Sequence, residues 1–69
     1  MGAVEVDVKK IATAMLDNGM GWSTLAEAAG LSTCALSNVK HGRKVMPSTA
    51  KKIADVFGWK ASQIARLSL

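Results

Sequence analysis

The sequence has few of the residues that define other classes of small protein. It has one cysteine, one proline, and an aromatic content of only 4%. A single cysteine cannot form an internal disulfide, which excludes a disulfide-stabilised secreted scaffold. No apolar run approaches the ~20 residues that a transmembrane helix needs. Acidic Glu5 and Asp7 stand among valines near the N-terminus, without the basic start of a signal peptide. We therefore expect a soluble, cytoplasmic protein.

The residues of an enzyme active site or a metal site are also missing. The sequence has no paired carboxylates, no cluster of metal ligands and no glycine-rich phosphate loop. Cys34 and His41 would lie roughly 10 Å apart along one helix, too far to share a metal or to act as nucleophile and base. We expect no enzymatic activity and no cofactor.

Acidic residues are absent between Ser32 and Ala54, where five of the nine lysines and arginines lie. This local positive charge would attract phosphate. It would equally serve as an ordinary solvated surface, and charge alone does not separate the two interpretations. The five residues are Lys40, Arg43, Lys44, Lys51 and Lys52.

Apolar residues at helical spacing predict five short helices within one domain over 1–69. Asp7, Ser32 and Ser62 are candidate N-caps, and Pro47 suits the first turn of a helix. Glycine or Asn-Gly ends the first four helices. Val4-Glu5-Val6 alternates but is too short to predict a strand by itself. The expected inward residues are Val8, Ile11, Ala12, Met15 and Leu16; Trp22, Leu25, Ala26 and Ala29; Ala35, Leu36 and Val39; Ala50, Ile53, Ala54 and Phe57; and Ile64, Ala65 and Leu67.

The resulting fold class is all-α, a compact bundle of about five short helices. The connection between the second and third helices is essentially Gly30-Leu31-Ser32. So short a turn forces a large angle between the two helices, which is the helix-turn-helix arrangement.

The outer face of the third helix carries only small polar groups and a histidine. Exposed helix faces usually hold lysine, glutamate, glutamine and arginine, which form helices better. Short polar side chains favour a helix that enters the major groove of DNA, where Asn38 can pair with an adenine edge and the Thr33 methyl can contact a thymine methyl. The alternative is an ordinary solvent-exposed face. The residues of this face are Thr33, Cys34, Ser37, Asn38 and His41.

With these features the chain resembles the Cro/repressor-type (XRE) helix-turn-helix family, which has the lambda-repressor-like fold. The resemblance extends from about Val4 to Leu67. The matching residues are Leu25-Ala26-Glu27, Ala29-Gly30-Leu31-Ser32, Leu36-Ser37, Val39, Gly42, Pro47-Ser48-Thr49-Ala50, Lys52-Ile53-Ala54 and Phe57-Gly58-Trp59.

The resemblance implies that residues 22–29 position a recognition helix over residues 33–41. Base-reading residues would be Thr33, Cys34, Ser37 and Asn38. Phosphate-binding residues would be Trp22, Ser23, Ser32, Lys40, His41, Arg43 and Lys44, whereas Lys51 and Lys52 are less certain.

Two departures from the family pattern bear on how DNA is read. The family's second helix commonly opens with a phosphate-contacting glutamine, where this chain has Trp22; the indole would either bind phosphate or pack against the first helix, and we favour packing. The base-reading face also lacks arginine and glutamine, so specificity per site would be modest. Cys34 is expected to serve as a small groove-facing residue, with a redox switch as the less favoured alternative.

The expected function is sequence-specific binding of double-stranded DNA by a transcriptional regulator, most simply a repressor of the prophage or mobile-element kind. The alternative is an antitoxin-like module that binds a partner protein and its own operator, because Pro47-Ser48-Thr49-Ala50 resembles a segment of such antitoxins. We expect a homodimer on DNA and a monomer when free. The dimer contact would be the last helix, with Leu67 and Leu69, or the loop around Val45 and Met46.

Overall fold

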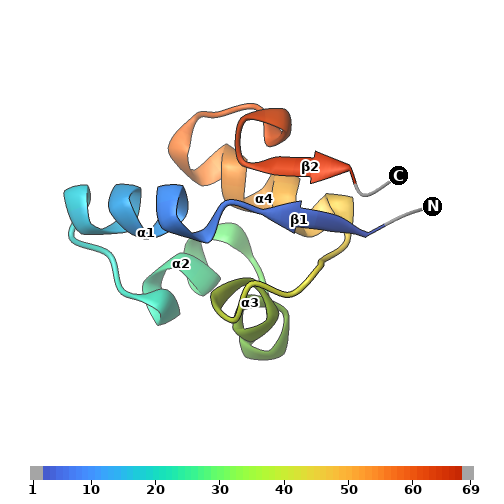
Figure 1. Cartoon of the computed structure of the whole chain (residues 1–69). Helices are drawn as coiled ribbons and strands as arrows, with labels where there is room; N and C mark the ends of the chain where they lie inside the picture. The colour runs from blue at the N-terminus through green and yellow to red at the C-terminus, as the bar shows by residue number, and fades with distance from the viewer. Residues whose placement is uncertain (1–2, 68–69) are drawn as a thin grey trace.

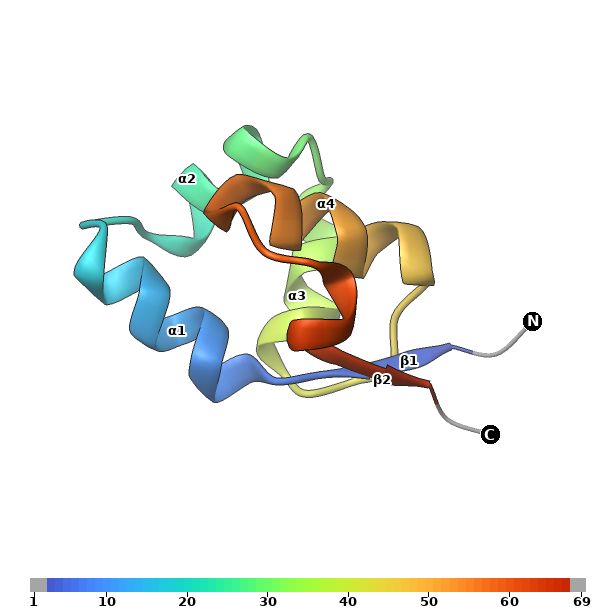
Figure 2. The same cartoon turned by 90° about the horizontal axis from the view of Figure 1, so that it is seen from above.

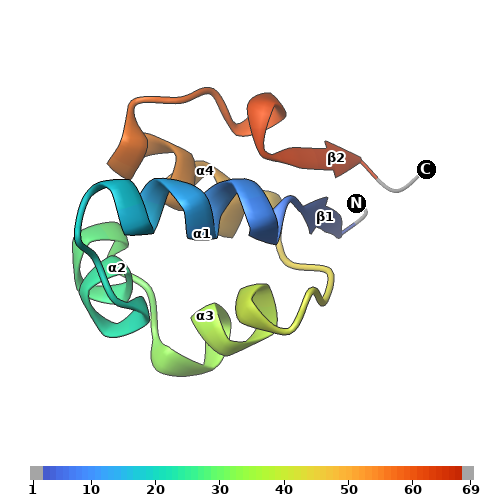
Figure 3. The ribbon, with the colours of Figure 1, turned by 60° about the vertical axis from the view of Figure 1, so that its left-hand side comes forward.

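The computed structural model describes residues 3–67, with the backbone alone of Leu67. Four α-helices and two short strands follow one another along these residues (Figure 1). They are β1 (Val4–Val6), α1 (Val8–Asp17), α2 (Trp22–Ala29), α3 (Thr33–Lys40), α4 (Pro47–Phe57), the 3₁₀ turn η1 (Ala61–Gln63) and β2 (Ala65–Leu67). Figures 1 and 3 show α3 on one side of the molecule and η1 on the opposite side, with α1, β1 and α4 between them.

The two strands change the predicted fold class. The protein is mostly helical, but residues 3–67 form four α-helices rather than five, and β1 pairs with β2 in an antiparallel sheet (Figure 2). The predicted last helix is therefore wrong: η1 is a single turn, and the chain then becomes extended. The physical reason is the alternating Val4-Glu5-Val6 segment, whose backbone provides hydrogen-bonding partners for the distant C-terminal segment.

Val4 also ties the strand pair to the chain that follows α3. Its N–H donates to the Val45 carbonyl at 2.8 Å, and the Val45 N–H donates back at 2.9 Å. Both side chains are buried. β1 therefore lies between β2 and the segment that leaves α3, and it fixes where that segment runs.

The predicted helix starts are confirmed for three of the helices. The Asp7 Oδ1 accepts from the Lys10 N–H at 3.0 Å at the start of α1, and the Ser32 Oγ accepts from the Ala35 N–H at 3.2 Å at the start of α3. Pro47 occupies the first turn of α4. Ser62 lies inside η1 and caps no α-helix, because that helix does not form.

All four helices end in the same pair of backbone hydrogen bonds, the Schellman motif. A glycine with φ between 64° and 72° follows each helix, and the N–H of the next residue donates to a carbonyl five residues back at 2.8–2.9 Å. The glycines are Gly19, Gly30, Gly42 and Gly58, as the sequence predicts.

The core lies between α1, α2, α3, α4 and the strand pair. Its fully buried larger side chains are Ile11, Leu25, Val39, Ile53 and Ile64. The inward face of α1 differs from the prediction: Ala12 is exposed and Leu16 is 80% exposed, whereas Ala14 is buried with Met15. Ala35 and Phe57, also predicted inward, are half-buried. Within the described residues, no helix has the length and apolar character needed to cross a membrane.

Candidate nucleic-acid interface

The connection between α2 and α3 holds the candidate site in place. Gly30 has a left-handed backbone with φ 68°, and the Leu31 N–H donates to the Ala26 carbonyl at 2.9 Å. The Leu31 side chain packs against the core, and Ser32 then caps α3. The start of α3 is thus fixed relative to the end of α2 by backbone bonds, an apolar anchor and a side-chain cap.

The small polar face of α3 points away from the core, as predicted. Leu36 and Val39 are buried and hold the opposite face. The four predicted base-reading residues are on the outer surface: Thr33, Cys34 and Ser37 are exposed, and Asn38 is half-buried. α3 therefore presents a surface of short side chains to solvent.

A shallow groove of about 260 Å³ lies between α2 and α3. Its floor is apolar, formed by Ala26 and Leu36. Its rim brings together six of the eleven predicted site residues from two helices: Trp22, Ser23, Thr33, Ser37, Lys40 and His41. Ser32, Cys34, Asn38, Arg43 and Lys44 lie outside this groove.

Trp22 packs against the core, and its binding of phosphate stays a prediction. Its side chain is half-buried and packs against the hydrophobic core at the start of α2. The residue before it, Gly21, supplies no side chain to cap α2. The first N–H groups of α2 therefore point outward without a side-chain acceptor from the cap position, beside the exposed Ser23.

Asn38 and Arg43 are hydrogen-bonded to each other, although the family resemblance implies that Asn38 reads bases and that Arg43 binds phosphate. The Arg43 Nη1 donates to the Asn38 Oδ1 at 3.3 Å, and the Arg43 backbone N–H donates to the Asn38 carbonyl at 2.9 Å. The signal that predicts this contact is Gly42, since the residue after such a glycine folds back over the helix.

Two of the basic residues have partners away from α3. The Lys51 Nζ lies 3.2 Å from the Asp55 carboxylate on the exposed side of α4. The Lys10 Nζ lies 5.0 Å from the centre of the Trp59 ring and donates to the Gln63 carbonyl at 3.4 Å. Lys51 is thus paired with an acid on α4, whereas Lys40, Arg43 and Lys44 lie at the end of α3 or shortly after it.

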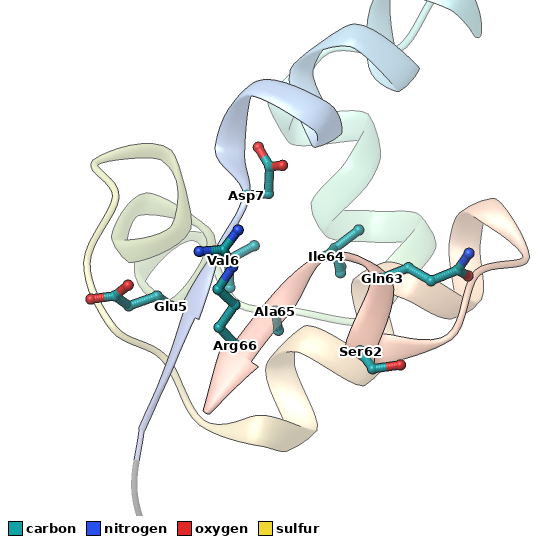
Figure 4. A pocket seen from close by; sticks show the side chains of 8 residues that line it. All are labelled: Glu5, Val6, Asp7, Ser62, Gln63, Ile64, Ala65 and Arg66. Atoms are coloured by element: carbon teal, nitrogen blue, oxygen red, sulfur yellow. The ribbon is translucent and has the colours of Figure 1, made fainter. Parts of the chain in front are cut away.

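A larger pocket of about 370 Å³ lies elsewhere, between the strand pair and η1 (Figure 4). It carries charges of both signs, from Glu5, Asp7 and Arg66, and contains none of the predicted site residues. Figure 4 shows the Arg66 side chain extending toward the start of α1, where Asp7 lies. In residues 3–67 no three histidine, cysteine or acidic side chains are grouped to hold a metal ion.

Comparison of the chain with models of protein families, with curated proteins and with solved structures gives no match. The function is therefore inferred from the residues of this chain and their arrangement.

Proposed function

We propose that the protein binds double-stranded DNA sequence-specifically by a helix-turn-helix formed by α2 and α3, and acts as a transcriptional regulator, most simply a repressor. The observation that carries the proposal is the outer face of α3. Thr33, Cys34 and Ser37 are exposed there without any long side chain among them, and Lys40 and Arg43 follow directly.

The size of these side chains is what favours the major groove. That groove is about 12 Å wide and accepts an α-helix, and short side chains let the helix backbone come close to the base edges. An exposed helix face under no functional constraint gains stability from better helix formers than threonine, serine and cysteine. The residues of this face are therefore better suited to binding DNA than to stabilising the helix.

Phosphate binding is supported by the start of α2 and by the cations at the end of α3. The first N–H groups of a helix attract anions, and here the Gly21 position leaves them without a side-chain cap. The Lys40 cation lines the same groove from the end of α3, and His41, the residue after α3, lines it as well. Phosphate contacts of this kind fix the register of the protein on the duplex, while base contacts specify the sequence.

A homodimer on DNA follows from the small footprint of one such domain. Two half-sites about 34 Å apart would add affinity and specificity. Of the contacts predicted from the sequence, Met46 is supported by its exposure of 64% in the loop that follows α3. Val45 is buried, and the side chains of Leu67 and Leu69 lie outside the described residues.

The experiment is a binding titration on duplexes selected from a random pool. Ser37→Glu places a negative charge on the outer face of α3 and should abolish binding to every duplex, because Ser37 is exposed and the helix tolerates glutamate. Ser62→Glu is the matched control, since it makes the same charge change in η1 at the opposite end of the molecule (Figure 1). Equal binding by both variants would show that α3 does not face DNA.

The antitoxin-like alternative also includes binding to an operator, so it predicts the same loss of DNA binding in Ser37→Glu. It differs in requiring a partner protein, and a partner-binding assay, rather than the duplex selection, separates the two functions. A recovered palindromic motif would support regulation through DNA and define the half-site spacing.

A further inference from the structure

The four helix ends share one backbone motif but differ in the side chains that it brings together. In each motif the residue after the glycine folds back and bonds a residue five positions earlier in the chain. At the ends of α1, α2 and α4 both residues are apolar, and the earlier one is buried in the core. Those pairs are Met15 with Met20, Ala26 with Leu31, and Ala54 with Trp59.

At the end of α3 the same two positions are held by Asn38 and Arg43. An apolar contact at these positions frequently accompanies the Schellman motif and adds to its stability. An exposed polar pair adds little, because water competes for both partners and the long arginine side chain loses freedom. The termination of α3 therefore does not require this pair, and the pair lies on the surface that we assign to DNA.

The chemistry of the guanidinium favours one orientation of the Asn38 amide. An arginine side chain only donates hydrogen bonds, so it can face the Oδ1 of Asn38 but not the Nδ2. The Arg43 Nη1 is 3.3 Å from that Oδ1, and the backbone bond of 2.9 Å holds Arg43 in place beside it. The contact thereby favours one of the two amide orientations before any DNA is bound.

We propose that Arg43 is a positioning residue that orients the Asn38 amide to read an adenine. Adenine offers an acceptor at N7 and a donor at N6 in the major groove. In the favoured orientation Nδ2 donates to N7, and Oδ1 has a second lone pair for the N6 donor while Arg43 occupies the first. This inference rests on the proposed function, and it gives Arg43 a part in specificity beyond its attraction for phosphate.

The test compares two affinities for each variant: one for a duplex selected by the parent chain from a random pool, and one for a scrambled duplex of the same composition. Asn38→Ala should lower the ratio of the two affinities by about tenfold, the value of a good bidentate contact. Arg43→Ala should lower the ratio as well. The ratio for the double variant should be no lower than the ratio for Asn38→Ala alone. An Arg43 that only contacts phosphate would weaken both duplexes equally and leave the ratio unchanged.

Lys40→Ala is the matched control, because it removes the same charge from an exposed residue near the end of α3. It should weaken both duplexes and leave the ratio as in the parent. If Arg43→Ala behaves like Lys40→Ala, the positioning role is wrong although DNA binding stands. If the parent chain binds no duplex, the proposed function is wrong and this inference fails with it.

A measurement on the free protein tests the contact without DNA. The side-chain amide signals of Asn38 in a nitrogen-15 NMR spectrum should shift in Arg43→Ala. Those of Asn18 should not shift, because the Asn18 Nδ2 donates to the Ala14 carbonyl at 2.7 Å in a different helix end. Unchanged Asn38 signals in the Arg43→Ala variant would overturn the inference whatever the DNA titration gives.

Discussion

Gly42 is the residue whose replacement tests most directly how the end of α3 is built. Its φ of 72° lies in the left-handed region, and a Cβ added there would meet no atom within 4 Å. The cost of Gly42→Ala is therefore backbone strain without steric overlap. An L-residue in this region costs roughly 1–2 kcal/mol. Alanine also restricts the unfolded chain, which offsets about 0.4–1 kcal/mol of that cost.

Gly21→Ala is the matched control for this prediction. Gly21 also has no atom within 4 Å of an added Cβ, but its φ of −92° and ψ of 174° are ordinary for alanine. Alanine at a cap position is less favourable than glycine by roughly 0.5–1 kcal/mol, and the same offset from the unfolded chain applies to it. The two variants should thus differ in unfolding free energy by about 0.5–1 kcal/mol, with Gly42→Ala the less stable.

Thermal unfolding followed by circular dichroism measures this difference. For a domain of this size, 1 kcal/mol corresponds to about 4–8 °C in Tm. Gly42→Asn should lose less stability than Gly42→Ala, because asparagine enters the left-handed region more readily. The reasoning would be refuted if Gly42→Ala melted at or above the temperature of Gly21→Ala.

Three further substitutions test other parts of the structure. Asp7→Ala removes the cap of α1 and should lower the unfolding free energy by ~1 kcal/mol in urea titrations. Asp7→Asn should retain most of the stability that the cap contributes. Leu16→Lys should change stability by no more than about 0.5 kcal/mol, because Leu16 is 80% exposed; a loss of several kcal/mol would place Leu16 in the core instead. Lys40→Ala should reduce by about one the slope of log affinity against log salt concentration, and an unchanged slope would remove Lys40 from the phosphate contacts.

Much of the helical framework could be predicted from local sequence, because the physical causes are local. Asp7 and Ser32 cap helices with their own side chains, and Gly30 and Gly42 end helices by adopting a backbone that other residues avoid. The outward face of α3 follows from the inward positions of its apolar residues. None of these features depends on a distant part of the chain.

The candidate site was predicted in part. The spacing of Thr33 and Ser37 places them on one helix face, and the structure adds that the same groove includes Trp22 and Ser23 from α2. The sequence pattern does not predict the Asn38–Arg43 contact directly, because the family resemblance implies separate roles for the two residues. Their proximity follows from Gly42, so the signal was in the sequence.

Local sequence alone determined where the four α-helices end, where three of them begin and which residues α3 exposes. The tertiary structure decided the fate of the C-terminal segment, since Ala65–Leu67 becomes a strand only because Val4–Val6 lies beside it. It also decided that Leu16 stays outside the core and that Val45 is fixed to Val4. The reason is physical: caps and turns act between neighbouring residues, whereas strand pairing and the choice of a buried face depend on residues that only folding brings together.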